Sequence, residues 1–372
     1  MRILEVANDL DVGGVQAYLC HLLPSYAARG HEARLALVTG RGTFAAALGP
    51  AVAETPVIGR LGPWKWPRPL GVAELARLID RFRPDVVRTH LFWGNTAGRM
   101  AALLSRHRPV LIATEHSTYF GKAAWQRRLD RWLAARTDCI LAVSDAVARF
   151  TAAQEAIPVE KFLALPLGLL PTEPMSGARD PEPVGFIGRR VVGVVARLVP
   201  DKGLDWYLRV LSRLTARRPD VLGLVVGDGP QRRELEALAE SLGLTDEHCR
   251  FLGAQHPVEP WLRSFSAFLL PSRREGFGLA PLEAMALGIP VVLSDLPAFR
   301  ELTNRGKYGT LVPLPPHGRL QTWVEAVEAV LDRPPEPAPI QAWVAQQYGW
   351  ERHVDRLLGV YAALLEQRSR TC

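Results

Sequence analysis

The 372-residue chain lacks the features that mark exported or membrane-spanning proteins. Its four cysteines are widely separated and form no CxxC pair, so neither a disulfide framework nor a structural zinc site is supported. No apolar run reaches the roughly 20 residues that a membrane-spanning helix needs. Glu5, Asn8 and Asp9 interrupt the N-terminal segment where a signal peptide would need an apolar run. We therefore expect a protein of the reducing cytoplasm.

The chain also lacks a strong excess of either charge. Lys and Arg number 45 against 38 Asp and Glu, which gives a formal net charge of +7 and a pI near 9.5. This excess favours anionic partners, but phosphorylated small molecules and acidic lipids fit it as well as nucleic acid does. The histidines form no cluster, and no Asp-x-Asp pair stands in a suitable loop. We therefore expect neither a bound metal nor a cofactor.

Strands and helices alternate along most of the chain, a pattern typical of parallel sheets covered by helices on both faces. In the first half, strands are predicted at 3–7, 32–38, 86–89 and 110–114, and helices at 15–29, 73–82 and near 125–136. In the second half, strands are predicted at 191–196, 222–226, 268–270 and 289–293, and helices at 232–242, from 280 and at 350–367. A stretch rich in Pro and Gly at 170–190 interrupts the alternation and predicts a linker between two α/β domains.

The stretch from 271 to 295 joins a polar loop, a helix and a strand. Pro281 fits the first turn of the helix, where a missing N–H is tolerated, and Gly288 is placed to end the helix. Free N–H groups at such a helix N-terminus form an anion site, worth about 0.3–1 kcal/mol per exposed charge. These groups belong to Gly276, Phe277, Gly278, Leu279 and Ala280. A diphosphate would fit there.

Two carboxylates flank this anion site. Glu275 lies before the helix and Glu283 is expected in its first turn, so both can accept hydrogen bonds from hydroxyl groups. A molecule that carries hydroxyls on both sides of a diphosphate is a nucleotide sugar. The simpler alternative is that Glu283 only complements the helix dipole and that Glu275 is a solvated loop residue.

In the first half, candidate ligand contacts follow the strand ends, where parallel sheets bind ligands. Gly13 and Gly14 would let a ligand approach the backbone, although a plain tight turn also explains the pair. His90 and His116 each come just after a strand. A single histidine at such a place is usually structural, whereas two on neighbouring strand ends favour a shared site.

The second half carries two cations, Arg197 and Lys202, in the loop after its first strand. The planar fork of an arginine and the point charge of a lysine can together neutralise a diphosphate, although such a pair is often only a surface feature. The later turn at 227–230 is not a dinucleotide fingerprint, because no third glycine follows.

Together these motifs resemble those of the retaining glycosyltransferases of family 4. The match rests on Glu275 and Glu283 with the glycines between them, on Arg197-x4-Lys202-Gly203, on Thr114-x-His116, and on segments 142–145 and 288–292. The resemblance implies the GT-B fold, in which two Rossmann-like, doubly wound parallel-sheet domains face a deep cleft. It also implies that Glu275 and His116 lie at the transferred sugar and that Glu283 contacts the ribose hydroxyls.

The resemblance assigns a role to each part of the chain. The domain at 1–170 would bind the acceptor, the domain at 171–350 would bind the donor, and a helix at 351–372 would pack back on the first domain. The family usually has Asn-Gly-Ile-Asp where this chain has Leu167-Gly168-Leu169, so one polar hinge residue is absent.

The candidate site residues follow from the motifs and the resemblance together. The catalytic candidates are His116, Arg197, Lys202 and Glu275. The donor-binding candidates are Gly14, Gly253, Gly276, Phe277, Gly278, Leu279, Ala280 and Glu283. The acceptor-side candidates are Gly13, Gln16 and His90, and Gln16 stands where the family frequently has glutamate.

The motifs and the resemblance together favour the function of a metal-independent retaining glycosyltransferase. The nucleoside diphosphate would leave from the front face, stabilised by cationic side chains and the helix N-terminus rather than by a protein nucleophile. The expected partners are a UDP- or GDP-linked sugar and a glycan, lipid-linked or small-molecule acceptor, without nucleic acid. The alternatives are another enzyme of this architecture, such as a nucleotide-sugar epimerase or a phosphorylase, and a non-catalytic sugar-binding protein.

Two segments combine tryptophan with basic residues. They are the loop at 61–69 and the helix near 125–136. This combination suits the boundary of an anionic membrane and would place the protein peripherally at the inner membrane face. A solvated helix face and a loop stiffened by proline explain the same composition.

Overall fold

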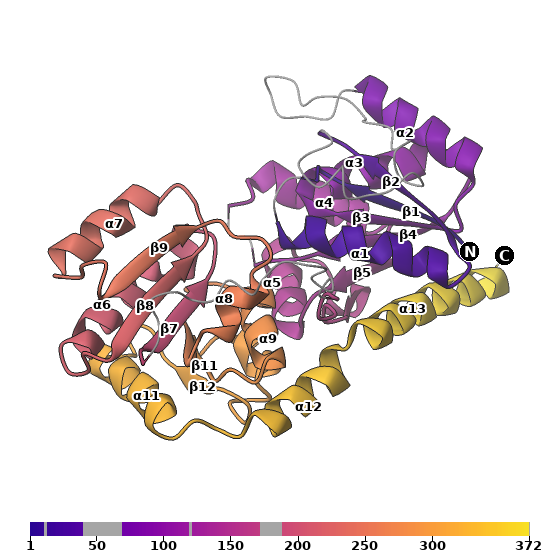
Figure 1. Ribbon diagram of the computed structural model, residues 1–372. Helices are drawn as coiled ribbons and strands as arrows, with labels where there is room; N and C mark the ends of the chain where they lie inside the picture. Colours follow the sequence, from indigo (N-terminus) through magenta and orange to yellow (C-terminus); the bar gives the residue numbers. More distant parts are fainter. Residues whose placement is uncertain (11–12, 40–68, 119–120, 172–187, 372) are drawn as a thin grey trace. The chain divides into compact units, whose positions relative to one another are not determined.

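The computed structural model describes residues 1–10, 13–39, 69–118, 121–171 and 188–371. The chain divides into two compact units, of which the first joins Met1–Leu170 to Trp350–Cys372 and the second is Pro171–Gly349. Each unit contains a six-stranded sheet in which all described pairings are parallel (Figure 1). The predicted class, a two-domain α/β protein with parallel sheets, is confirmed.

The first sheet has the strand order β2-β1-β3-β4-β5-β6. Its strands are β1 (Arg2–Ala7), β2 (Glu32–Leu37), β3 (Val86–His90), β4 (Val110–Glu115), β5 (Cys139–Ala142) and β6 (Phe162–Ala164). Its helices are α1 (Gly14–Ala28), α2 (Pro69–Phe82), α3 (Leu91–Leu104), α4 (Ala124–Ala134) and α5 (Asp145–Glu155), with a short 3₁₀ turn at Val159–Lys161. Because helices cover both faces, β1 and β3 are buried along nearly their whole length.

The second sheet has the order β12-β11-β10-β7-β8-β9. Its strands are β7 (Arg190–Val195), β8 (Val221–Val226), β9 (Cys249–Gly253), β10 (Ala267–Leu270), β11 (Val291–Ser294) and β12 (Thr310–Val312). Its α-helices are α6 (Leu204–Thr215), α7 (Arg232–Ser241), α8 (Glu259–Arg263), α9 (Leu279–Ala286), α10 (Pro297–Leu302), α11 (Leu320–Asp332) and α12 (Pro337–Tyr348), and Pro200–Lys202 forms a 3₁₀ turn. Helix α11 packs with α6, and α12 packs with α9.

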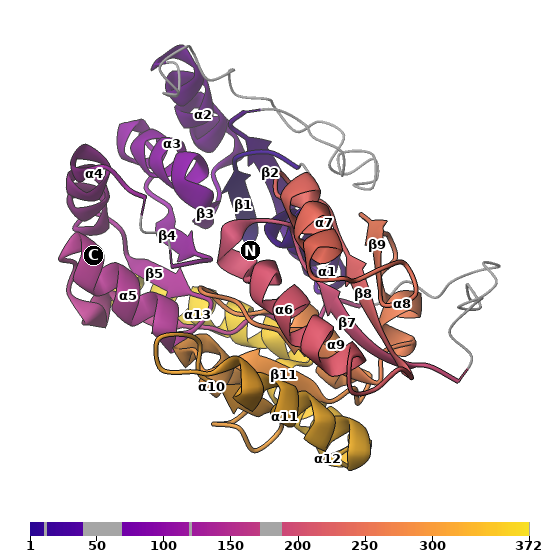
Figure 2. The same cartoon turned by 90° about the vertical axis from the view of Figure 1, so that its left-hand side faces the viewer.

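The last helix, α13 (Trp350–Thr371), belongs to the first unit and lies beside α1 and β4 (Figures 1 and 2). The hydroxyl of Tyr18 lies 2.8 Å from Nε2 of His353. The indole of Trp350 donates a hydrogen bond to Ser25 Oγ at 2.9 Å. The buried side chain of Tyr361 lies with its hydroxyl 2.9 Å from that of Tyr26. Residues from opposite ends of the chain therefore share one core.

The strands predicted above lie within one residue of their observed bounds, with one exception. The exception in position is the strand predicted at 289–293, which begins only at Val291. Gly288, at φ +78°, ends α9, and the Ile289 N–H bonds the Ala284 carbonyl at 3.0 Å in a helix-capping turn. The basic loop predicted at 61–69 lies outside the described residues except for Pro69, as does most of the linker predicted at 170–190. No helix within the described ranges is both long and apolar enough to cross a membrane.

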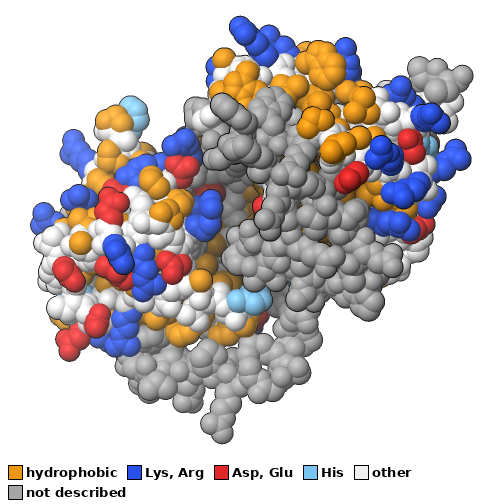
Figure 3. All heavy atoms as spheres, turned by 90° about the horizontal axis from the view of Figure 1, so that it is seen from above, with side chains coloured by type: hydrophobic (Ala, Val, Ile, Leu, Met, Phe, Trp, Pro, Cys, Tyr) orange, Lys and Arg blue, Asp and Glu red, His pale blue; other side chains and the backbone are white. Residues whose placement is uncertain are grey.

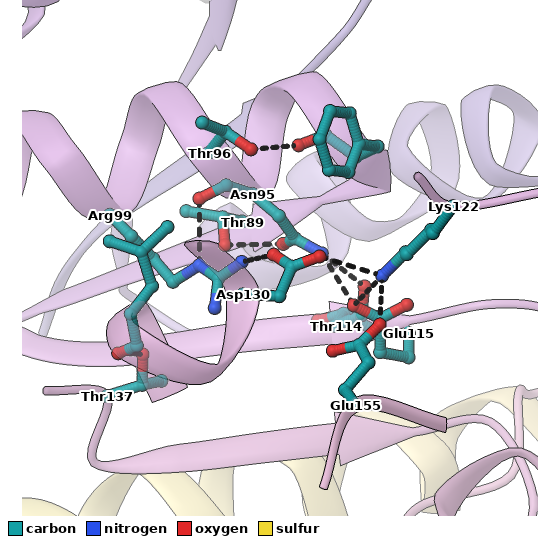
Figure 4. A network of polar contacts seen from close by, with 12 residues as sticks. Thr89, Asn95, Thr96, Arg99, Thr114, Glu115, Lys122, Asp130, Thr137 and Glu155 are labelled. Carbon is teal, nitrogen blue, oxygen red and sulfur yellow. Dashed lines mark hydrogen bonds and ion pairs between the residues drawn. The ribbon is translucent and has the colours of Figure 1, made fainter. Parts of the chain in front are cut away.

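A buried cluster of charges ties β4 to α3, α4 and α5 (Figure 4). Lys122, only 7% exposed, contacts Glu155, lies 3.0 Å from Asp130 and lies 4.0 Å from Glu115. Arg99 donates to Asp130 at 2.6 Å. Burial would lower the pKa of Lys122, but the three carboxylates raise it above its usual value. Burial also raises the pKa of Glu155 to about 7, despite the nearby ammonium.

We predict that Lys122→Met lowers the free energy of unfolding by about 3–5 kcal/mol near neutral pH, because it leaves buried carboxylates without their cation. The loss should shrink as the pH falls through about 7, where Glu155 takes up a proton more readily in the folded than in the unfolded chain. Denaturant titrations at several pH values would measure this.

Arg128→Met, which removes an exposed cation from the same region, is the matched control and should cost less than about 0.5 kcal/mol. Equal effects of the two substitutions would show that the cluster contributes nothing beyond a surface charge.

Candidate active site

Both sheets have a point where the chain reverses its direction across the sheet. In the first sheet the chain goes from β1 outward to β2 and then returns to β3 on the other side of β1. In the second it goes from β7 to β8 and β9 and then returns to β10. Ligands of parallel α/β sheets bind beside such reversal points, at the carboxyl ends of the strands. Most of the predicted site residues follow the four strands beside these reversal points, β1, β3, β7 and β10.

In the second unit, the loop after β7 is joined to the loop after β10. The Lys202 ammonium lies 2.5 Å from Oε1 of Glu275, which also accepts a hydrogen bond from Ser272 Oγ at 3.1 Å. The backbone N–H of Arg273 donates to the carbonyl of Asp201 at 2.7 Å. Gly203, at φ +65°, lets the two loops approach, since a Cβ there would lie 2.0 Å from the Pro271 carbonyl oxygen. The sequence predicted that these two loops carry one site, and the structure brings them into contact.

The cations of these loops differ in how far they are already paired. Arg273 makes a two-pronged bond with Asp205 at 2.7–2.8 Å, and Arg274 lies 2.8 Å from Asp201. Arg197, by contrast, is exposed and pairs with no carboxylate in the part of the chain that the structure describes. Its guanidinium is therefore available to an anionic ligand.

Helix α9 begins at Leu279, with Gly278 as its N-cap at φ +103°. A side chain at Gly278 would meet the Phe299 ring at 2.8 Å. The N–H groups of Leu279 and Ala280 lie in the first turn and have no carbonyl partner within the helix. The N-terminus of α9 thus has the free N–H groups on which the predicted anion site depends, and it lies close in sequence to Glu275.

The prediction that Glu283 lies in the first turn of this helix was wrong. Because the helix starts at Leu279, Glu283 lies beyond the first turn, which contains no acidic residue. Burial raises the pKa of Glu283 to about 7. Among the described residues none forms a hydrogen bond or ion pair with its carboxyl group. The group is therefore poorly solvated and unmatched, and hydrogen-bond donors from a ligand would stabilise its ionised form.

Two further candidates of the second unit, Phe277 and Gly253, offer a ligand only their backbone groups. Phe277 is buried and its ring packs edge-on against Tyr348, with 5.6 Å between centroids, so its side chain supports the loop. Gly253 ends β9 at φ +71°, and its carbonyl accepts a hydrogen bond from the Gly227 N–H at 2.8 Å. Within the described ranges no group of three or more His, Cys, Asp or Glu side chains is arranged so that it could hold a metal ion.

In the first unit, His90 and His116 lie side by side at the ends of β3 and β4. Nδ1 of His90 is 2.9 Å from Nε2 of His116, and Nε2 of His90 is 2.7 Å from Oε2 of Glu5. Burial lowers the pKa of both histidines, and the positive charge of Arg88 lowers each further. Both imidazoles are therefore neutral at pH 7.

The loop between β1 and α1 contains the remaining candidates of this unit. Gln16 donates a hydrogen bond to Asp9 Oδ1 at 3.0 Å, which turns its amide toward the end of β1. A side chain at Gly13 would meet the Gln16 Oε1 atom at 2.5 Å. Gly14 is exposed and is the first residue of α1.

Sequence reasoning missed two residues behind the histidines. Glu5 and Arg88 are fully buried on β1 and β3, and their charged atoms lie 3.8 Å apart. Burial acts to raise the pKa of Glu5, but Arg88 and the hydrogen bonds from His90 and Tyr26 outweigh it and lower that pKa. The available signal was a charged residue among the apolar residues of each of two predicted strands, which predicts a buried partner.

Comparison with known proteins identifies the family. Residues 12–169 match the family described as Glycosyltransferase Family 4, and residues 189–333 match that described as Glycosyl transferases group 1. A lipopolysaccharide core biosynthesis mannosyltransferase of Rhizobium leguminosarum is 30% identical over 270 residues, which cover 68% of this chain and 72% of the relative. The chain belongs to glycosyltransferase family 4. The GT-B expectation and the assignment as a glycosyltransferase are thereby confirmed.

Two further matches extend over most of the chain. A GDP-mannose-dependent phosphatidylinositol monomannoside mannosyltransferase of Mycolicibacterium smegmatis is 29% identical over 345 residues, which cover 83% of this chain and 85% of the relative. The crystal structure of the Anabaena protein HepE in complex with UDP-glucose superposes with a TM-score of 0.81 at 22% identity. That match covers 98% of this chain and 100% of HepE and supports the GT-B fold.

Proposed function

We propose that this family 4 glycosyltransferase is a metal-independent, retaining enzyme that uses a UDP- or GDP-linked sugar. The acceptor would be a hydroxyl group of a glycan, a lipid-linked glycan or a small molecule. The observation that carries the proposal is the contact of Lys202 with Glu275, because it joins the loop after β7, which also contains the exposed Arg197, to the loop after β10. The names of the relatives, which include GDP-mannose and UDP-glucose, support the choice of donor.

In the proposed donor complex the second unit holds the nucleotide sugar. Arg197, Lys202 and the N-terminus of α9 would neutralise the diphosphate, the arginine through its planar fork and the lysine through its ammonium. Lys202 has three N–H donors, so it can bond a phosphate oxygen and keep Glu275 in place. Glu275 would accept hydrogen bonds from the transferred sugar, and Glu283 would accept those of the ribose hydroxyls.

The proposed chemistry needs no nucleophile from the protein. The bond between the anomeric carbon and the diphosphate oxygen breaks, and the acceptor oxygen bonds the same carbon on the same face. The leaving phosphate oxygen takes the proton of the acceptor hydroxyl. Negative charge therefore develops on the leaving group, where preorganised cations are worth most. In this scheme the first unit binds the acceptor, and His116 lies beside the transferred sugar.

A screen of UDP- and GDP-linked sugars tests the proposal. Binding to the intact protein should raise its stability by about 2.7 kcal/mol at 100 times the Kd, which a thermal-shift assay detects. A donor so found should be turned over only with an acceptor, in EDTA as well as in Mg²⁺, and NMR of the product should show a retained anomeric configuration. Turnover of the donor to an epimer without acceptor would instead favour an epimerase, and binding without any turnover would favour a sugar-binding protein.

We predict that Arg197→Ala and Lys202→Ala each lower turnover by at least about 100-fold, because loss of one preorganised charge contact costs roughly 2.7–4 kcal/mol in the transition state. Initial rates with the identified donor would measure this. Arg209→Ala, which removes an exposed arginine from α6, is the control and should retain full activity. Unchanged rates for both site variants would refute the diphosphate assignment.

The two glutamates should separate in a calorimetric experiment. Donor binding should draw the Glu283 pKa down from about 7 and release protons, so wild-type affinity should rise between about pH 5 and pH 7. Glu283→Gln should abolish this pH dependence and weaken nucleoside diphosphate binding about tenfold or more, since a hydrogen bond to a charged group contributes about 1.5–3 kcal/mol. Titrations in buffers of different ionisation enthalpy count the protons.

Glu275→Gln should keep its affinity for the nucleoside diphosphate, because the glutamate is assigned to the sugar and its removal leaves Lys202 free for phosphate. It should instead lower kcat with the intact donor. Equal losses of nucleoside diphosphate affinity in the two variants would contradict the division of roles.

We further propose that α4 contacts an anionic membrane. Trp125, Arg128 and Trp132 follow one face of this helix at helical spacing, and the two indoles are 42% and 47% exposed. Figure 3 shows hydrophobic side chains bordered by Lys and Arg on the first unit. The phosphatidylinositol monomannoside acceptor named for one relative supports a lipid-linked acceptor here. Tryptophan and arginine together suit the headgroup region of anionic bilayers.

Sedimentation with vesicles tests this contact. We predict that the protein binds vesicles rich in phosphatidylglycerol but not pure phosphatidylcholine vesicles, and that the triple variant Trp125→Ala, Trp132→Ala, Arg128→Ala binds at least about tenfold more weakly. Arg209→Ala should bind as the wild type does. Undiminished binding of the triple variant would eliminate α4 as the contact.

A further inference from the structure

A chain of buried hydrogen bonds runs from Glu5 through His90 to His116. Oε2 of Glu5 is 2.7 Å from Nε2 of His90, and Nδ1 of His90 is 2.9 Å from Nε2 of His116. Glu5 and His90 are fully buried, and the two imidazole rings are stacked with 5.2 Å between centroids. Every step joins one specific atom to another, so the proton positions along the chain can be derived.

The carboxylate of Glu5 determines which atom donates in each hydrogen bond. Ionised Glu5 can only accept, so Nε2 of His90 carries the proton. Nδ1 of a neutral His90 then has a free lone pair and accepts from the Nε2–H of His116. In a neutral His116 that leaves Nδ1 without a proton. The histidine therefore presents a lone pair at the far end of the chain.

The charges nearby favour this neutral arrangement. Glu5 is already balanced by the guanidinium of Arg88, 3.8 Å away, so no imidazolium is needed to neutralise it. Oε1 of Glu5 also accepts a hydrogen bond from Tyr26 at 2.8 Å. Arg88 donates to Thr114 and Tyr18, which holds its charge beside the pair. Burial lowers the pKa of His90, and the charge of Arg88 lowers it further, so both favour the neutral imidazole.

The hydrogen-bond chain ends at His116 with an atom that has no partner among the described residues. Nδ1 of His116 is buried, and no described residue forms a hydrogen bond with it. A buried acceptor without a hydrogen-bond partner destabilises the protein, and a donor group of a ligand would remove that cost.

We propose that Glu5 and His90 are positioning residues that hold His116 as a hydrogen-bond acceptor, so that the ligand group bound by its Nδ1 atom must be a donor, such as a sugar hydroxyl. With the role proposed above for His116, on which this reading of the ligand rests, that hydroxyl belongs to the transferred sugar. A carboxylate in its place would set two acceptors against each other, and a deoxy position would leave Nδ1 unmatched. The hydrogen-bond chain from Glu5 through His90 to His116 thus selects neutral, hydroxylated sugars over uronic acids and over sugars that lack this hydroxyl.

The proton positions can be measured in the whole protein without a ligand. Long-range ¹H–¹⁵N NMR of histidine-labelled protein at neutral pH should show His90 and His116 neutral, each protonated at Nε2 and unprotonated at Nδ1. Spectra of His116→Asn and His90→Asn assign the signals. A proton on Nδ1 of His116, or an imidazolium at either position, would overturn the proposal whether or not the protein is a glycosyltransferase.

Glu5→Gln should reverse the direction of hydrogen-bond donation from Glu5 through His90 to His116. Tyr26 and Arg88 hold the amide oxygen on their side, so the NH₂ group faces His90 and donates to its Nε2. Both histidines should then be protonated at Nδ1, and kcat/KM with a hydroxylated donor should fall at least about tenfold, as a wrong tautomer does in other enzymes. Tyr26→Phe removes a bond to the same carboxylate but keeps its charge, so it should keep both tautomers and stay within about threefold of wild-type activity.

These measurements separate the proposals. If Glu5→Gln reverses the tautomers but leaves kcat/KM unchanged, the proposed selection of a hydroxyl is wrong. If kcat/KM of Glu5→Gln falls only as much as that of Tyr26→Phe, the role of Glu5 is structural. If Glu5→Gln does not fold, the wild-type spectrum still decides the proton positions. If no donor is turned over at all, the glycosyltransferase mechanism fails while the tautomer result stands.

Discussion

A charge buried near the end of a parallel strand must be paired within the chain or matched by a ligand, because an isolated buried ion costs several kcal/mol. In the first unit, Glu5 is paired with Arg88, and Lys122 is surrounded by carboxylates. In the second unit, Lys202 contacts Glu275. These pairs join loops and strands that lie far apart in sequence. They therefore fix the backbone around the groups that remain unmatched.

In the proposed site, the groups that have no partner among the described residues suggest the chemistry of the ligand. Arg197 offers a cation, Glu283 offers a carboxyl group whose ionised form burial disfavours, and His116 offers a neutral acceptor. A phosphate suits the first of these, and hydroxyl groups suit the other two. In the proposed mechanism, the contact between Lys202 and Glu275 holds this cation in place before the donor binds. Little reorganisation is then needed when charge develops on a leaving group.

The parts of this site that depend on local sequence could be predicted, and the parts that depend on register or distant pairing could not. Gly278 and Pro281 indicate the start of a helix. Only the structure shows that Leu279 is its first residue and that Glu283 therefore lies beyond the first turn. The same applies to β11, whose start is delayed by the capping turn after α9. Glu5 and His90 are 85 positions apart, so no local pattern joins them. Their strands were predicted correctly, and only the neighbouring positions of β1 and β3 in the sheet bring them together.

The return of α13 to the first unit makes that unit's folding depend on the order of synthesis. Tyr361 and His353 complete a core whose other members, Tyr18 and Tyr26, lie 335 positions earlier in the sequence and leave the ribosome before them. At about 5–20 residues per second, the early residues wait on the order of ten seconds or more for their partners. The second unit, whose residues are contiguous, has no such delay. On the nascent chain, the segment made first is therefore the one that finishes folding last.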